Sequence, residues 1–177
     1  MPLRFAIERD GVWSELTPPT QVLFLSQAVL ITRALSLAAE IGIADLLVAG
    51  PQNAEELARS TSSDPQALYR VLRLLGSVGV FSEIEPGRFA LTPLGGCLRT
   101  GTPESLRSWL RMSGLPMWYR TIAEAMYSLK TGESTFERAN GAEFFDYLAA
   151  HPDEGGGIQR LDGRLRPSGR RSGRPIL

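Results

Sequence analysis

The sequence predicts a mostly α-helical fold: a winged helix-turn-helix with a short β-hairpin wing, plus additional dimerisation helices. The first observation is that residues 53–98 are punctuated as helix, turn, helix and hairpin. The second is an apolar helix over residues 20–39 with hydrophobic side chains round most of its circumference. The chain has 177 residues, of which 43% are hydrophobic, so one domain with its own core can form.

The helix-turn-helix begins at Asn53. This residue can cap a short helix over Ala54–Arg59, whose two first-turn glutamates complement the positive end of the helix dipole. Asp64 is a second N-cap, and Pro65 takes the first helical position, where its missing N–H costs nothing. The longer helix that follows has one apolar face, made of Leu68, Val71, Leu72, Leu75 and Val78.

The wing follows directly. Gly79 supplies a stop for the second helix. Val80–Glu85 and Arg88–Leu91 have the composition of two short strands, and Pro86-Gly87 between them is typical of a tight turn. These residues predict a β-hairpin.

The helix over Thr20–Ala39 predicts self-association. Its apolar residues spread over most of its surface, so it must be buried on nearly all sides. A domain of this size rarely surrounds a helix alone, and a second copy of the chain is the simplest cover. A membrane-surface helix would need a basic polar face, whereas Arg33 is its one cation. We therefore expect a homodimer whose interface includes Leu23, Val29, Leu30 and Leu37.

Composition excludes several classes of site. The single cysteine, Cys97, excludes an internal disulfide and fits a reducing cytoplasm. No metal-binding cluster of cysteines and histidines is available. His151, the one histidine, stands at a helix end before Pro152 and is interpreted as a residue of the cap rather than a catalytic base. No signal peptide or membrane span is recognised, so we expect a cytoplasmic protein without a membrane partner.

After the wing, Thr92-Pro93 is typical of another cap and first helical turn, and the short helix ends at Gly95-Gly96. Longer helices are predicted over Ser105–Met112, Met117–Lys130 and Glu143–Ala150. Trp and Met residues on the first two have two interpretations. They are core residues, which is the commoner case, or they line a pocket for a small molecule. The candidates for pocket lining are Met112, Trp118 and Tyr119.

A winged helix also suggests DNA binding, so a winged-helix transcription regulator is the alternative function. Base readout and phosphate contacts need several cations. The second helix offers Arg70 and Arg73, but the wing carries Glu83 and Glu85 against Arg88. This charge disfavours specific binding to nucleic acid.

The chain divides into an N-terminal arm (1–19), a winged-helix dimerisation domain (20–154) and a basic tail (155–177) that we expect to be disordered. Acidic residues followed by Gly155–Gly157 resemble the loop that binds nucleotides or S-adenosylmethionine. That loop must follow a buried strand and open a helix. Here a helix end precedes it, so we expect no cofactor to bind this chain.

Several ordered motifs over residues 16–154 carry a resemblance to a known family: TPPTQVLFLSQAVLITRALSLAAEIGIADLL, AEELARSTSSDPQALYRVLRLLGSVGVF, RFALTPLGGCLR and KTGESTFERANGAEFFDYLAAHPDE. This order resembles the N-terminal dimerisation region of S-adenosylmethionine-dependent small-molecule O-methyltransferases, of the plant caffeate/flavonoid type and its bacterial relatives.

The resemblance implies a homodimer that lends walls to a substrate pocket for a small hydroxylated molecule, aromatic or polyketide-like. In this family, S-adenosylmethionine and a histidine base belong to a C-terminal catalytic domain. No position here matches the family's catalytic motifs, so no catalytic or cofactor-binding residue is assigned. We expect this chain to lack the catalytic half and to be inactive alone. We further expect that residues after about Glu154 are a reading-frame accident, with the catalytic domain encoded in another frame.

Overall fold

The computed structural model describes residues 16–155, so the expectations for the N-terminal arm up to residue 15 and for the tail beyond residue 155 lie outside the described residues. The helices are α2 (Pro18–Ser26), α3 (Ala28–Glu40), α4 (Ile43–Leu46), the 3-10 turn η3 (Leu47–Ala49), α5 (Ala54–Thr61), α6 (Pro65–Ser77), α7 (Pro93–Gly96), α8 (Arg107–Ser113), α9 (Pro116–Ala123), α10 (Ala125–Thr131), α11 (Phe136–Asn140), α12 (Phe144–Ala150) and α13 (Pro152–Gly155). The strands are β1 (Gln52–Asn53), β2 (Phe81–Glu85) and β3 (Arg88–Leu91).

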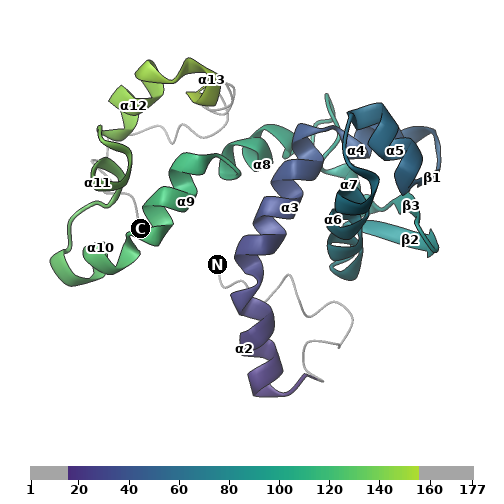
Figure 1. The fold of residues 1–177 in the computed structure, drawn as a ribbon, viewed down its shortest axis with the longest axis horizontal. Helices are drawn as coiled ribbons and strands as arrows, with labels where there is room; N and C mark the ends of the chain where they lie inside the picture. The colour runs from purple at the N-terminus through teal and green to yellow at the C-terminus, as the bar shows by residue number, and fades with distance from the viewer. Residues whose placement is uncertain (1–15, 156–177) are drawn as a thin grey trace.

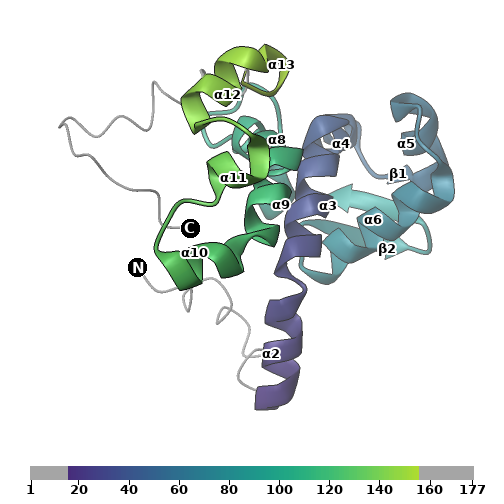
Figure 2. The same ribbon diagram turned by 60° about the vertical axis from the view of Figure 1, so that its left-hand side comes forward.

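The described chain forms two lobes joined by α8 (Figure 1). The first lobe contains the winged helix, built from α4–α7 and the strands, and its core includes the C-terminal half of α3. The second lobe is formed by α9–α13, with a smaller core around Met117, Phe136 and Tyr147. Helix α2 extends away from both lobes, as Figures 1 and 2 both show.

The winged helix-turn-helix is confirmed, together with the local signals that predicted it. Asn53 donates its backbone N–H to the Glu56 carboxylate at 3.0 Å. The Asp64 side chain accepts the backbone N–H of Ala67 at 2.7 Å, and Pro65 opens α6. One feature was not predicted: β1 pairs with β3, so the wing is part of a three-stranded antiparallel sheet in the order β1-β3-β2.

The helix expected over Thr20–Ala39 is in fact two helices, bent by 43°. The Ser26 hydroxyl donates to the Leu23 carbonyl at 2.6 Å. In an unbroken helix that carbonyl would accept the N–H of Gln27, which instead donates to the Phe24 carbonyl at 3.0 Å. Competition of this kind between a serine hydroxyl and the backbone bends helices. The expectation of one helix over Met117–Lys130 is likewise wrong, because Glu124 separates α9 from α10.

Helices α3 and α8 cross at very short range. A Cβ atom on Gly114 would lie 1.6 Å from the Ser36 hydroxyl oxygen, and Ser36 is itself buried. The Arg33 guanidinium donates to the Gly114 carbonyl at 2.6 Å, while Arg111 donates to the Glu40 carboxylate at 3.1 Å. The crossing therefore requires a small residue at Gly114.

Arg107 ties the end of α3 to α4 and α8. Its Nε donates to the Ala39 carbonyl at 2.7 Å, and its Nη1 donates to the Asp45 carboxylate at 2.9 Å. That carboxylate also accepts the backbone N–H of Thr100 at 2.8 Å and the Thr100 hydroxyl at 2.7 Å. Burial by itself would raise the pKa of Asp45, but the Thr100 hydrogen bonds and the Arg107 charge together hold that pKa below its ordinary value.

We expect Gly114→Ala to destabilise the protein by about 1–3 kcal/mol, because the added methyl group overpacks the α3–α8 crossing. Gly96→Ala is the matched control, since its Cβ would meet nothing within 4 Å. The free energy of unfolding in urea checks both variants. A Gly114→Ala protein as stable as the parent would contradict the close crossing.

We expect Asp45→Asn to lower the free energy of unfolding by about 1 kcal/mol at neutral pH, because a partly exposed charge-assisted hydrogen bond is lost. A lowered folded-state pKa means that the stabilisation is present above the ordinary carboxyl pKa of 3.8 and is lost as the pH falls through the folded-state value. The difference between parent and variant should therefore shrink below about pH 4. An equal difference at pH 7 and pH 3 would contradict the role of the ionised carboxylate.

Candidate functional site

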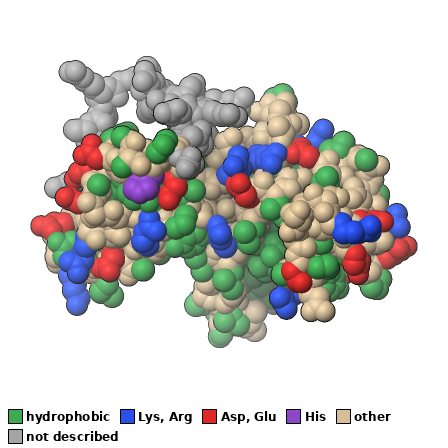
Figure 3. Space-filling model, turned by 45° about the horizontal axis from the view of Figure 1, so that its top comes forward, with side chains coloured by type: hydrophobic (Ala, Val, Ile, Leu, Met, Phe, Trp, Pro, Cys, Tyr) green, Lys and Arg blue, Asp and Glu red, His purple; other side chains and the backbone are tan. Residues whose placement is uncertain are grey.

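The main candidate site is the apolar surface of α2 and the first part of α3, which we call the uncovered face. No residue of α2 is buried, and the buried residues of α3 begin at Ala34. Figure 3 shows charged side chains spread over this face of the molecule and hydrophobic side chains gathered at its lower centre. Large exposed side chains of the uncovered face include Val22, Leu23, Leu25, Val29 and Leu30.

The predicted interface residues fall on this face with one difference in depth. Leu23, Val29 and Leu30 are exposed by 63%, 46% and 54%. Leu37 is half-buried on α3 and adds less free surface. Three of the four predicted interface residues are thus exposed in the described chain.

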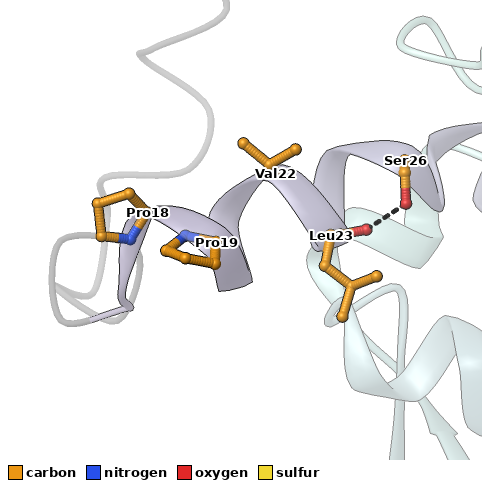
Figure 4. Close-up of a pocket in the computed structure, with 5 residues that line it drawn as sticks. All are labelled: Pro18, Pro19, Val22, Leu23 and Ser26. Atoms are coloured by element: carbon orange, nitrogen blue, oxygen red, sulfur yellow. Dashed lines mark hydrogen bonds between the residues drawn. The ribbon is translucent and has the colours of Figure 1, made fainter.

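An open groove of about 580 Å³ runs along α2. Figure 4 shows Pro18, Pro19, Val22 and Leu23 along it, with Ser26 at its inner end donating its hydroxyl to the Leu23 carbonyl. The prolines fix the backbone of the first turn without needing donors. This groove is an open, uncharged and largely apolar surface rather than a polar pocket.

A second candidate is the aromatic cluster of the C-terminal lobe. The Phe136 ring lies edge-on to those of Phe144 and Tyr147 at centroid distances of 5.2 and 5.7 Å, and the Trp118 ring lies 5.7 Å from that of Phe144. Edge-to-face and tilted packing of this kind stabilises aromatic clusters. The rings hold α9, α11 and α12 together.

Of the predicted pocket residues, Trp118 joins this cluster and Tyr119 is its neighbour on α9, whereas Met112 is buried on α8 and belongs to neither core. Trp118 Nε1 and the Tyr119 hydroxyl are buried without a hydrogen-bond partner within residues 16–155. A buried polar group left unpaired costs about 1–3 kcal/mol. These two atoms are therefore candidates to bind a polar group from outside the described chain.

A polar network beside the cluster escaped the sequence analysis. The Arg120 guanidinium donates to the Asn140 side-chain oxygen at 2.9 Å and to the Tyr147 hydroxyl at 2.8 Å. The Asn140 amide donates to the Thr121 hydroxyl at 2.9 Å. Asn140 precedes Gly141 and has only the local signature of a turn, so nothing in the sequence linked it to α9.

The wing is fastened to α6 by Glu83. Its carboxylate accepts the Tyr69 hydroxyl and the Gly87 backbone N–H, both at 2.9 Å, and Arg73 lies 4.0 Å away. The Gly87 hydrogen bond is the main cause that lowers the pKa of Glu83, and the hydrogen bond to Glu83 raises the pKa of Tyr69. An ionised acid thus stands beside the helix that would read DNA in a winged-helix regulator.

Residues 16–155 contain no group of three His, Cys, Asp or Glu side chains that could hold a metal ion. No single helix there has the length and apolar composition to span a membrane; only α2 and α3 taken together, as a bent pair, meet that criterion.

Comparison with known proteins finds similarity over the winged helix and most of the helix pair before it. Residues 23–101 match the model of the O-methyltransferase dimerisation domain. The chain is 46% identical over 123 residues to a phenazine O-methyltransferase of Lysobacter antibioticus, covering 70% of this chain and 36% of that protein. It is 45% identical over 123 residues to a 3-amino-4-hydroxybenzoate 4-O-methyltransferase of Streptomyces cremeus, covering 69% and 33%.

The structural comparison agrees. The solved structure of a mitomycin 7-O-methyltransferase matches with a TM-score of 0.76 and 32% identity, covering 83% of this chain and 44% of that one. The chain thus spans about a third of the length of the curated relatives it matches.

We expect Tyr119→Phe to leave the free energy of unfolding unchanged or to raise it, because an unpaired buried hydroxyl is removed. Tyr147→Phe is the matched comparison: its hydroxyl is bonded to Arg120, so its loss should cost about 1 kcal/mol. Urea unfolding of both variants checks the difference. If Tyr119→Phe is the more destabilising of the two, its hydroxyl has a partner within the folded chain.

Proposed function

Residues 23–101 belong to the O-methyltransferase dimerisation domain family, and on that premise we propose that this chain associates with a second copy through the uncovered face. The observation that carries the proposal is the exposure of Leu23, Val29 and Leu30 on a helix pair whose first member has no charged and no buried residue. Burial of apolar surface stabilises association by roughly 25 cal/mol per Å². Leu37, at the margin of this face, completes the proposed interface.

We also propose that the module serves methyl transfer from S-adenosylmethionine to a small hydroxylated molecule. The support is the agreement among relatives named for O-methylation of a phenazine, an aminohydroxybenzoate and a mitomycin. All three substrates contain ring systems, which favours an aromatic or polyketide-like acceptor. The activity is a property proposed for the complete enzyme of this family.

The described residues do not fit S-adenosylmethionine by themselves. Donor sites of this kind use a glycine-rich loop between a buried parallel strand and a helix. The sheet in residues 16–155 is antiparallel, and its strands contain two to five residues. The glycine run from Gly155 lies at and beyond the edge of the described chain. We therefore assign no catalytic or donor-binding role to any described residue.

For the acceptor pocket we propose Trp118 and Tyr119 as lining residues, with Met112 as a flexible apolar contact. Trp118 Nε1 and the Tyr119 hydroxyl have no partner in the described chain, and both can donate a hydrogen bond to a ligand oxygen. Flat aromatic ligands also pack well against an indole ring. These features support a wall of a pocket rather than its reacting centre.

Regulation by DNA binding is less well supported. Arg73 lies beside the Glu83 carboxylate, and that carboxylate is held ionised by the Gly87 hydrogen bond. A phosphate backbone would meet this negative charge at the wing, and electrostatic attraction to phosphates dominates DNA affinity.

We expect Leu30→Asp to weaken self-association of the full chain by about a hundredfold, because an unpaired charge buried in an apolar interface costs several kcal/mol and ~1.4 kcal/mol is tenfold in affinity. Ile84→Asp is the matched control, since Ile84 is also exposed, by 50%, but lies on the wing. Sedimentation velocity over a range of concentrations gives both dissociation constants. A parent chain that is monomeric at every concentration, or a Leu30→Asp chain that dimerises like the parent, would refute the proposed interface.

A further inference from the structure

Asn140 and Gly141, at the end of α11, contain two groups that can react with each other. The Gly141 backbone nitrogen can attack the side-chain amide carbon of Asn140, because glycine has no side chain to obstruct the approach. The fold itself requires this glycine, since Gly141 ends α11 with a φ of +79°. The other asparagine of the chain, Asn53, precedes Ala54, whose methyl group hinders the same attack.

The folded lobe holds the two reacting groups apart. The Asn140 side-chain nitrogen donates to the Phe136 carbonyl at 3.1 Å, one turn earlier in α11, and to the Thr121 hydroxyl of α9 at 2.9 Å. Side chains of a helix tilt toward its N-terminus, whereas the Gly141 nitrogen lies on the C-terminal side. The Gly141 N–H in turn donates to the Glu137 carbonyl at 2.7 Å. Both groups therefore stay engaged elsewhere while α11 is folded.

Arg120 fastens this arrangement from α9. Its Nε donates to the Asn140 side-chain oxygen at 2.9 Å, and its Nη2 donates to the Tyr147 hydroxyl at 2.8 Å. One guanidinium thus joins α9 to both α11 and α12. Hydrogen bonds from a charged donor are stronger than those between neutral groups, so Arg120 is the side chain that contributes most to keeping Asn140 in place.

The lobe that contains this network has a small core. Its buried residues are Met117, Phe136 and Tyr147, far fewer than those of the core around the winged helix. Regions with few buried contacts open locally at a lower free energy than the rest of a protein. Opening of α11 would release the Asn140 amide and the Gly141 nitrogen at the same time.

From these contacts we propose that Asn140 is a deamidation site that the folded lobe protects, so that its modification records the opening of α11. In the reaction the Gly141 nitrogen loses its proton and bonds to the side-chain amide carbon of Asn140. The bond from that carbon to the amide nitrogen breaks, and ammonia leaves with the proton. Water then opens the resulting succinimide ring at either carbonyl carbon, which gives aspartate or isoaspartate.

The product cannot restore the contacts that protected the asparagine. An ionised aspartate only accepts hydrogen bonds, yet it would face the Phe136 carbonyl oxygen. It would also face the Thr121 hydroxyl oxygen, whose proton is already donated to the Met117 carbonyl at 2.8 Å. Isoaspartate adds a methylene group to the backbone and displaces the Gly141 N–H from its acceptor. Although the Arg120 charge attracts either carboxylate, the lost donor leaves buried acceptors unpaired, and the modified lobe opens more often.

Mass spectrometry of the full chain tests the site. The protein is kept in mildly alkaline buffer at urea concentrations from zero to beyond unfolding, and is then digested with trypsin. Peptide 139–160 contains Asn140 and peptide 34–59 contains Asn53, so each sample carries its own control for the replacement of NH2 by OH. We expect Asn140 to persist in the folded chain and to be converted faster than Asn53 once urea opens the lobe. Equal rates for Asn140 in folded and unfolded chains would overturn the protection, and conversion no faster than that of Asn53 in the unfolded chain would overturn the site.

Two variants test the role of Arg120 without denaturant. We expect Arg120→Ala to speed the conversion of Asn140 in the folded chain by about tenfold, because loss of two charge-assisted hydrogen bonds raises the open population. Lys130→Ala is the matched control, since Lys130 is another exposed cation of the same lobe, and it should keep the parent rate. An Arg120→Ala chain that converts no faster than the Lys130→Ala chain would contradict the protective role of Arg120.

Asn140→Asp reproduces one product directly and tests its consequence. We expect amide hydrogen exchange in α11 and α12 to become about tenfold faster, because the open form of the lobe is more populated. Exchange in α6, which belongs to the other core, should match the parent. An Asn140→Asp chain whose α11 exchanges at the parent rate would overturn the claim that the modified lobe opens more often.

Discussion

The crossing of α3 and α8 holds the two lobes in place. Gly114 has no side chain and Ser36 has a small one, so the helix backbones approach more closely than larger residues would allow. Arg33 and Arg107 then fasten the crossing with hydrogen bonds to backbone carbonyls, and Arg111 adds an ion pair with Glu40. Because packed helices are not continuously deformable, this contact sets the direction in which α9 leaves the first lobe.

The same crossing divides α3 into two functional parts. Its C-terminal half packs against α6 and α8 and contributes to the core of the winged helix. Its N-terminal half, with α2, extends beyond that core and keeps its large apolar side chains exposed. A winged helix in this chain is therefore a scaffold that presents a helix pair. The ionised Glu83 beside Tyr69 and Arg73 is consistent with that use.

Much of the fold could be predicted because its signals are local. The hydrogen bonds at the helix starts of Asn53, Asp64 and Thr92 each join groups three residues apart, so a short stretch of sequence is enough to recognise them. The bend at Gln27 arises because the Ser26 hydroxyl, and not the Gln27 N–H, donates to the Leu23 carbonyl. Sequence periodicity cannot reveal which of the two donors forms that hydrogen bond. The two-residue strand β1 exists only because β3 lies beside it.

The candidate site divides in the same way. The excess of apolar residues over residues 20–39 predicted exposed apolar surface on this helix, and Leu23, Val29 and Leu30 are exposed there. That a second copy covers them stays a prediction. The surroundings of Trp118 could not be predicted, since Phe136 and Phe144 reach it from elements far along the chain. Trp118 Nε1 and the Tyr119 hydroxyl are buried without a hydrogen-bond partner within residues 16–155, and only the assembled lobe reveals this.

Hydrogen exchange of the full chain at several protein concentrations tests most directly the claim that a second copy covers α2. We expect amide protection in α2 and the first turns of α3 to rise with concentration as the dimer forms. Protection in α6, whose apolar face is already buried, should not change. Fast exchange in α2 at concentrations where sedimentation finds a dimer would contradict the account.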